Sequence, residues 1–125
     1  MPSYKILVVE DESVVAKDLQ TLLEDLGYII TSVVASGEEA ITMARQTHPD
    51  LVLMDIELKG PLNGIEAARH IHDELGIPVI YLTSYVDEET VERAKLTEPF
   101  VCVLKPYEDQ ELHHMIKKAL LLRRA

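Results

Sequence analysis

Five short apolar runs, separated by stretches of helical spacing, constrain the fold of this chain most strongly. The runs are Ile6 to Val9, Ile29 to Val34, Leu51 to Met54, Val79 to Leu82 and Phe100 to Leu104. Four of them are nearly unbroken, as in strands that are buried on both faces of a parallel sheet. The run over residues 29–34 contains Thr31 and Ser32, so we predict that it forms an edge strand.

The segments between the runs carry apolar residues at the spacing of a helix that packs on one face. Gly27 and Gly76 are placed to end the first and third of these helices, and Ser36 with Glu39 is a capping-box pattern at the start of the second. The segment 87–98 has helix formers but little apolar content, which predicts a short, weakly held helix. The predicted apolar stripes are Val15, Leu19, Leu22 and Leu26; Ala40, Met43 and Ala44; Ile65, Ala68, Ile71 and Leu75; and Leu112, Ile116, Ala119 and Leu120.

Strict alternation of strand and helix predicts an α/β fold, a three-layer α/β/α sandwich around a parallel sheet. A length of 125 residues suits one domain with its own core, so we expect a single domain over residues 1–125. The last residues, 120–124, are apolar and then basic. They fit either a final helical turn or a helix that continues from about residue 122 into a further domain.

Charge and composition narrow the classes of partner. The formal net charge is -10, which disfavours direct binding to nucleic acid and favours a divalent cation or a basic protein surface. Cys102 is the only cysteine, so an internal disulfide is excluded and a reducing compartment is expected. The chain starts without a signal-peptide pattern, and no apolar run is long enough to span a membrane. We therefore expect a soluble, cytoplasmic protein.

Polar side chains follow four of the five apolar runs. Glu10 and Asp11 come after the first run, Asp55 after the third, Thr83 after the fourth and Lys105 after the fifth. The carboxyl ends of parallel strands meet at one edge of the sheet, where functional loops gather. Each residue taken singly has an ordinary explanation as a helix cap or a turn residue. The set, delivered from four strands to one edge, favours a functional site.

The chemistry of this set points to phosphoryl transfer. Crowded carboxylates repel one another unless a cation lies among them, and Mg2+ is the hard cation that binds through a few carboxylates and keeps several waters. Such an ion also offsets the charge of a phosphoryl group. An aspartate carboxylate can accept that group as an acyl phosphate. Lys105 would add positive charge, and the Thr83 hydroxyl would donate to a phosphoryl oxygen.

Four segments, in order and at matching spacing, resemble the signature segments of response-regulator receiver domains. The resemblance covers the chain from about Tyr4 to the final helix. It implies a flavodoxin-like, five-stranded parallel sheet of order 2-1-3-4-5. It also implies a switch that accepts a phosphoryl group from a histidine kinase or a phosphotransfer protein, and that catalyses only its own phosphorylation and dephosphorylation. The four segments are Val8 to Glu12, Leu53 to Ile56, Leu82 to Ser84 and Leu104 to Tyr107.

The resemblance also assigns roles to residues. Asp55 becomes the phosphoacceptor, and Mg2+ (or Mn2+) is held by Glu10, Asp11, Asp55 and the backbone carbonyl of Glu57. Thr83 and Lys105 become the switch hydroxyl and the lysine of the family. The resemblance further implies a cis peptide bond between Lys105 and Pro106, against a low base rate for X-Pro bonds. It is also compatible with a homodimer through the fourth and fifth helices, and with an effector or kinase domain after this one.

Two segments depart from the usual receiver pattern. The loop 57–64 is one residue longer than the common form and resembles receivers attached to sensor histidine kinases. Cys102 stands three residues before Lys105, where receivers usually carry an aromatic residue that changes rotamer on activation. The usual relay from Thr83 to that aromatic is therefore absent, unless Phe100 or Tyr85 takes its place.

Three other functions fit parts of the pattern. A phosphatase of the haloacid-dehalogenase type would use Asp55 and Glu57 as paired acids, but there the nucleophile follows the first strand. A flavin binder of the same fold needs a Ser-, Thr- or Gly-rich phosphate loop after the first strand, where this chain has Glu10 and Asp11. A receiver-like docking module that is not phosphorylated would not need the acidic residues together with Thr83 and Lys105. The presence of the complete set in this chain argues against that function.

Overall fold

The computed structural model describes residues 4–56, 64–83, 102–104 and 107–124. The predicted helix over 87–98 lies outside these residues. The elements along the chain are β1 (Lys5–Val9), α1 (Ser13–Asp25), β2 (Ile29–Val34), α2 (Gly37–Thr47), β3 (Leu51–Asp55), α3 (Gly64–Leu75), β4 (Val79–Thr83), β5 (Cys102–Leu104) and α5 (Asp109–Arg124).

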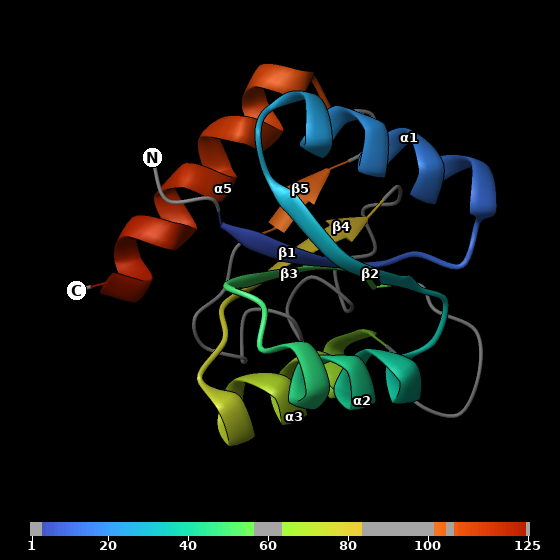
Figure 1. Cartoon of the computed structure of the whole chain (residues 1–125), viewed down its shortest axis with the longest axis vertical. Coiled ribbons are helices and arrows are strands. Elements are labelled where there is room, and N and C mark those ends of the chain that lie inside the picture. The colour runs from blue at the N-terminus through green and yellow to red at the C-terminus, as the bar shows by residue number, and fades with distance from the viewer. Residues whose placement is uncertain (1–3, 57–63, 84–101, 105–106, 125) are drawn as a thin grey trace.

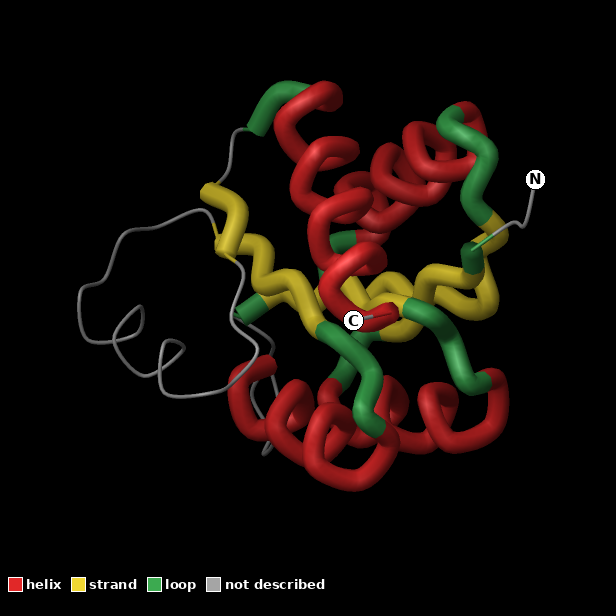
Figure 2. The backbone as a smooth tube through the Cα atoms, turned by 90° about the vertical axis from the view of Figure 1, so that its left-hand side faces the viewer, coloured by secondary structure: helices red, strands yellow, loops and turns green. Residues whose placement is uncertain are grey.

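The five strands form one parallel sheet in the order β2-β1-β3-β4-β5. Helices α1 and α5 cover one face of this sheet, and α2 and α3 cover the other (Figure 1). Figure 2 shows the strands between the two helical layers. The α/β/α sandwich and the sheet order are therefore confirmed, as is the edge position of the strand over 29–34. None of the helices among the described residues is long and apolar enough to cross a membrane.

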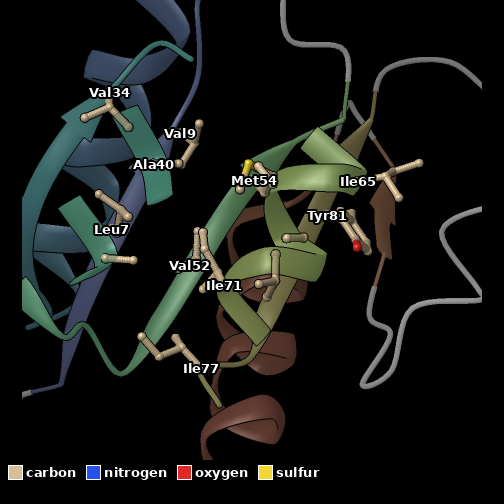
Figure 3. Packing of buried hydrophobic residues seen from close by; sticks show 14 of the residues in the cluster. Leu7, Val9, Val34, Ala40, Val52, Met54, Ile65, Ile71, Ile77 and Tyr81 are labelled. Carbon is tan, nitrogen blue, oxygen red and sulfur yellow. The ribbon is translucent and has the colours of Figure 1, made fainter. Parts of the chain in front are cut away.

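The pleat of each central strand divides its side chains between two cores. In β1, Leu7 and Val9 face α2 and α3, whereas Ile6 and Val8 face α1 and α5. Figure 3 shows the core on the α2 and α3 side, where Val52 and Met54 of β3 lie near Ile71 of α3. Because β3 is buried along its whole length, it reads as an unbroken apolar run in the sequence.

The predicted helix signals lie where the helices begin and end. The backbone N–H of Glu39 donates to Ser36 Oγ over 3.2 Å, and the Ser36 hydroxyl donates to Glu39 Oε1 over 3.1 Å, so this capping pair opens α2. Gly27 follows α1 with a φ of 96°, and Gly76 follows α3 with a φ of 68°. Both glycines adopt the left-handed conformation that commonly ends a helix.

The apolar stripe predicted for α1 was partly wrong. Ala16, Leu19 and Leu23 are the buried residues of this helix, while Val15 and Leu22 are only partly buried. The prediction chose one of two apolar lines at helical spacing and passed over Ala16 and Leu23. The buried line is rotated from the predicted one, and this rotation turns Val15 and Leu22 toward a surface groove beside α5.

A β-bulge interrupts the edge strand β2. Ile6 pairs with Ile30 and Leu7 pairs with Ser32, so Thr31 is an extra residue without a partner on β1. The Thr31 hydroxyl donates to the carbonyl of Ile6 over 3.5 Å. The extra residue reverses the pleat, so Ile30 packs with the α1 and α5 core and Val34 with the opposite core.

Candidate functional site

Three carboxylates meet where β1 and β3 end. β1 and β3 are neighbours in the sheet, with Val9 beside Met54, so Glu10 and Asp55 follow at the same edge. One oxygen from each of Glu10, Asp11 and Asp55 lies within 4.8 Å of the others. Glu10 is 3% exposed and Asp55 6% exposed, whereas Asp11 is half-buried. The acidic set predicted from the sequence is thus confirmed as a cluster.

Backbone hydrogen bonds hold two members of this cluster in place. The N–H of Glu10 donates to the carbonyl of Val34 over 2.9 Å, which ties the end of β1 to the end of β2. The N–H of Glu12 donates to Glu10 Oε2 over 3.1 Å, so the Glu10 carboxylate also faces the start of α1. Beyond Asp55, the N–H of Ile56 donates to the carbonyl of Leu82 on β4 over 3.1 Å.

The start of α1 has no side-chain cap on its N-cap residue. Glu12 is the N-cap residue of α1, but its side chain makes no capping hydrogen bond. Its carbonyl accepts the first helical bond, from the N–H of Ala16 over 2.9 Å. The carboxylate that approaches the helix start is that of Glu10, which belongs to the acidic cluster.

The cluster fits a hard divalent cation. Three carboxylate oxygens can share one ion at this spacing, and Mg2+ is bound in proteins by one or two carboxylates with waters completing its shell. Two of the three side chains are almost fully buried, so bulk water screens their mutual repulsion only weakly. A bound cation would offset that repulsion.

Tyr107 lies beside the cluster, and sequence reasoning gave it no role. Its side chain is half-buried, and burial together with the nearby carboxylates of Asp109, Glu10 and Asp18 raises the pKa of Tyr107 to about 12. The same ring lines a groove of about 460 Å³ between α1 and the start of α5. In the sequence, its position two residues after Lys105 could have indicated that Tyr107 lies near the site. The groove is lined by Val15, Asp18, Leu19, Thr21, Leu22, Asp25, Tyr107 and Asp109.

The remaining predicted site residues are only partly described. Thr83 is the last residue of β4 and pairs with Leu104 of β5, so its backbone lies toward the same edge as Asp55. The side chains of Thr83 and Cys102 lie outside the described part of the chain. Glu57, Lys105 and the Lys105–Pro106 bond lie outside it too.

Comparison with known proteins identifies the family. The sequence model of the response regulator receiver domain matches residues 6–117. This chain belongs to that family. The transcriptional regulatory protein PdtaR of Mycobacterium tuberculosis is 32% identical over 116 residues, which are 93% of this chain and 56% of PdtaR. The phyllosphere-induced regulator PhyR of Methylorubrum extorquens is 30% identical over 97% of this chain and 45% of PhyR.

Solved receiver structures share the whole fold. The signal receiver domain of a modulated diguanylate cyclase from Desulfovibrio desulfuricans G20 has a TM-score of 0.93, with 37% identity and 98% of both chains covered. The receiver domain of PhyR from Erythrobacter litoralis has a TM-score of 0.86, with 30% identity over 100% of this chain and 95% of that one. These likenesses place the chain among the receiver domains of two-component signalling. The chain spans about half the length of the curated relatives named above.

Proposed function

We propose that Asp55 of this receiver domain accepts a phosphoryl group in a reaction that depends on Mg2+ or Mn2+. The observation that carries the proposal is the cluster of Glu10, Asp11 and Asp55, whose oxygens lie within 4.8 Å of one another at the carboxyl ends of β1 and β3. Asp55 ends the central strand β3, so its carboxylate is presented at the edge where receivers carry their phosphoacceptor.

The proposed reaction requires few groups from the protein. An oxygen of the Asp55 carboxylate attacks the phosphorus of a phosphohistidine on a histidine kinase or phosphotransfer protein. The new O–P bond forms as the N–P bond breaks, and the histidine nitrogen leaves with the electron pair. Glu10, Asp11 and the backbone carbonyl of Glu57 would hold the cation with Asp55, and that cation offsets charge on the phosphoryl oxygens. The domain would thus catalyse its own phosphorylation and dephosphorylation and no other reaction.

Phosphorylation would then act as the switch. It replaces the single negative charge of the Asp55 carboxylate with an acyl phosphate that carries about 1.5 to 2 negative charges. In the proposal Thr83 donates its hydroxyl to a phosphoryl oxygen, and Lys105 pairs with another. Reversing a mostly inactive population takes about 5.5 kcal/mol in favour of the active form, so these contacts must act together. The output domain, a homodimer through the fourth and fifth helices and a cytoplasmic location stay predictions.

The phosphoacceptor is tested with a small phosphodonor. The chain is incubated with acetyl phosphate and Mg2+, and its mass is followed by mass spectrometry. We expect one phosphoryl group on the unchanged chain and on Asp25→Asn, which alters an exposed carboxylate of α1. We expect none on Asp55→Asn, and none when a chelator removes the cation. Equal modification of Asp55→Asn would contradict the proposal. A folded chain that is never modified would favour the docking module.

A further inference from the structure

The first residue of α3 lies directly against the backbone of the proposed phosphoacceptor. Gly64 is buried, and its N–H donates to the carbonyl of Ile56 over 3.4 Å. A Cβ at this position would lie 2.9 Å from the Cα of Ile56 and 3.0 Å from the carbonyl carbon of Asp55. It would lie closer still to the carbonyl oxygen of Asp55. The start of α3 therefore packs on the peptide that joins Asp55 to Ile56, with no room for any side chain.

The requirement for glycine here is one of space. Gly64 is within the first turn of α3, where the backbone is helical and open to every residue type. Gly76 offers the opposite case, because its φ of 68° is left-handed and nothing lies within 4 Å of a Cβ there. An alanine at Gly76 would strain its own backbone alone. An alanine at Gly64 would have to displace the backbone of Asp55 and Ile56 or the start of α3.

The peptide that Gly64 contacts is held on its other side by β4. The N–H of Ile56 donates to the carbonyl of Leu82 over 3.1 Å, while the carbonyl of Ile56 accepts from Gly64. The segment leaving Asp55 is thus fixed between β4 and α3. A Cβ at Gly64 would have to gain about half an ångström to reach ordinary contact with Ile56 Cα, and more than that to clear the carbonyl oxygen of Asp55. A displacement of that size, passed to Asp55, would move its carboxylate relative to those of Glu10 and Asp11.

We infer that Gly64 is a positioning residue. Because it has no side chain, α3 can pack on the Asp55–Ile56 peptide and so fix the position of the Asp55 carboxylate. This inference rests on the proposed role of Asp55 as phosphoacceptor. Reacting groups need close alignment, and a misplacement of about 1 Å can cost about 100-fold in rate. A shift of at least half that size predicts a loss of at least about tenfold in the rate of phosphorylation at saturating Mg2+ and donor.

The test compares Gly64→Ala with Gly76→Ala. Both are expected to be less stable, since one crowds the backbone and the other strains it. Phosphorylation of Asp55 by acetyl phosphate is measured at a temperature where circular dichroism shows both variants folded, with Asp55→Asn as a blank. We expect Gly64→Ala to be phosphorylated at least about tenfold more slowly at saturating donor, and Gly76→Ala to match the unchanged chain. Equal rates for both variants would overturn the inference.

A second measurement covers the case in which Gly64→Ala does not fold. Coupling between two sites is reciprocal. If the packing of Gly64 positions the Asp55 carboxylate, then a ligand bound at Asp55 should in turn stabilise the hydrogen bond from the Gly64 N–H to the carbonyl of Ile56. Hydrogen exchange of the Gly64 amide is measured on the unchanged chain with and without beryllofluoride and Mg2+. Slower exchange in the loaded state is expected, and an unchanged rate would overturn the inference. Phosphorylation of Asp55→Asn would instead refute the proposed function, so the two failures are distinguishable.

Discussion

Asp11 is the most exposed of the three clustered carboxylates, so its substitution perturbs the protein core least. We expect Asp11→Asn to bind Mg2+ at least tenfold more weakly, because one of three shared oxygen ligands loses its charge. A ligand at 100 times its dissociation constant stabilises the fold by about 2.7 kcal/mol. At that same concentration, a tenfold weaker variant loses about 1.4 kcal/mol of this stabilisation. Thermal or urea unfolding of both chains, with and without Mg2+, measures this loss of stabilisation.

Asp25→Asn is the matched control for this prediction. Asp25 is an exposed residue at the end of α1, and its substitution makes the same change of charge away from the cluster. Its stabilisation by Mg2+ should equal that of the unchanged chain. If Asp11→Asn behaved like this control, the cluster would not be the site that Mg2+ occupies.

Tyr107 gives the domain a dependence on alkaline pH. Burial, with carboxylates nearby, raises the pKa of Tyr107 to about 12 in the folded chain, against about 10 in an unfolded one. The folded state therefore keeps the proton longer. The contribution of Tyr107 to stability is complete below pH 10 and declines as the pH rises from about 10 to about 12. We expect urea unfolding of Tyr107→Phe to lose less stability over this window than the unchanged chain. If the free energy of unfolding changed equally with pH in both chains, the raised pKa assigned to Tyr107 would be wrong.

The members of the acidic cluster were predictable, whereas Gly64 and Tyr107 were not. Glu10 and Asp55 each follow a buried strand, and adjacent parallel strands bring their carboxyl ends together whatever the details of packing. The role of Gly64 depends on how closely α3 approaches β3, which is a property of packing in three dimensions. No spacing in the sequence encodes that distance.

At the scale of one element, the capping pair at Ser36 stabilises the start of α2. Ser36→Ala removes the oxygen that accepts the N–H of Glu39, and losing such a cap costs about 1 kcal/mol. We expect the free energy of unfolding in urea to fall by that amount. Ser13→Ala, at the start of α1, should change it by less than about 0.5 kcal/mol, because that helix has no side-chain cap. A loss of similar size in both variants would show that the capping bond is not the cause.

Helix ends were easier to predict than helix faces. Ser36, Gly27 and Gly76 act through their own backbone and side-chain chemistry, so local sequence is sufficient to place them. The buried face of α1 depends on the partners it meets, and there the small Ala16 packs inward beside Leu19 and Leu23. Spacing alone does not distinguish Leu22 from its neighbour Leu23, so it gave Val15 and Leu22 too much weight.

At the scale of the whole molecule, alternation of strands and helices predicted the three layers, but the order of the strands came from the resemblance to receivers. Periodicity shows that strands are buried and does not show which strands are neighbours. The weak apolar content of residues 29–34 was enough to place that strand at an edge, because only an edge strand tolerates Thr31 and Ser32 in its centre.

The bulge at Thr31 has a consequence for how copies of the domain meet. An exposed strand edge offers a row of backbone donors and acceptors, and such rows seed aggregation by pairing with strands of other chains. In β2 the extra residue breaks this row into two residues before Thr31 and three after it. A bulge of this kind twists an edge strand away from regular pairing, and a net charge of -10 adds repulsion between chains. We therefore expect β2 to be a poor template for edge-to-edge pairing between copies of the domain.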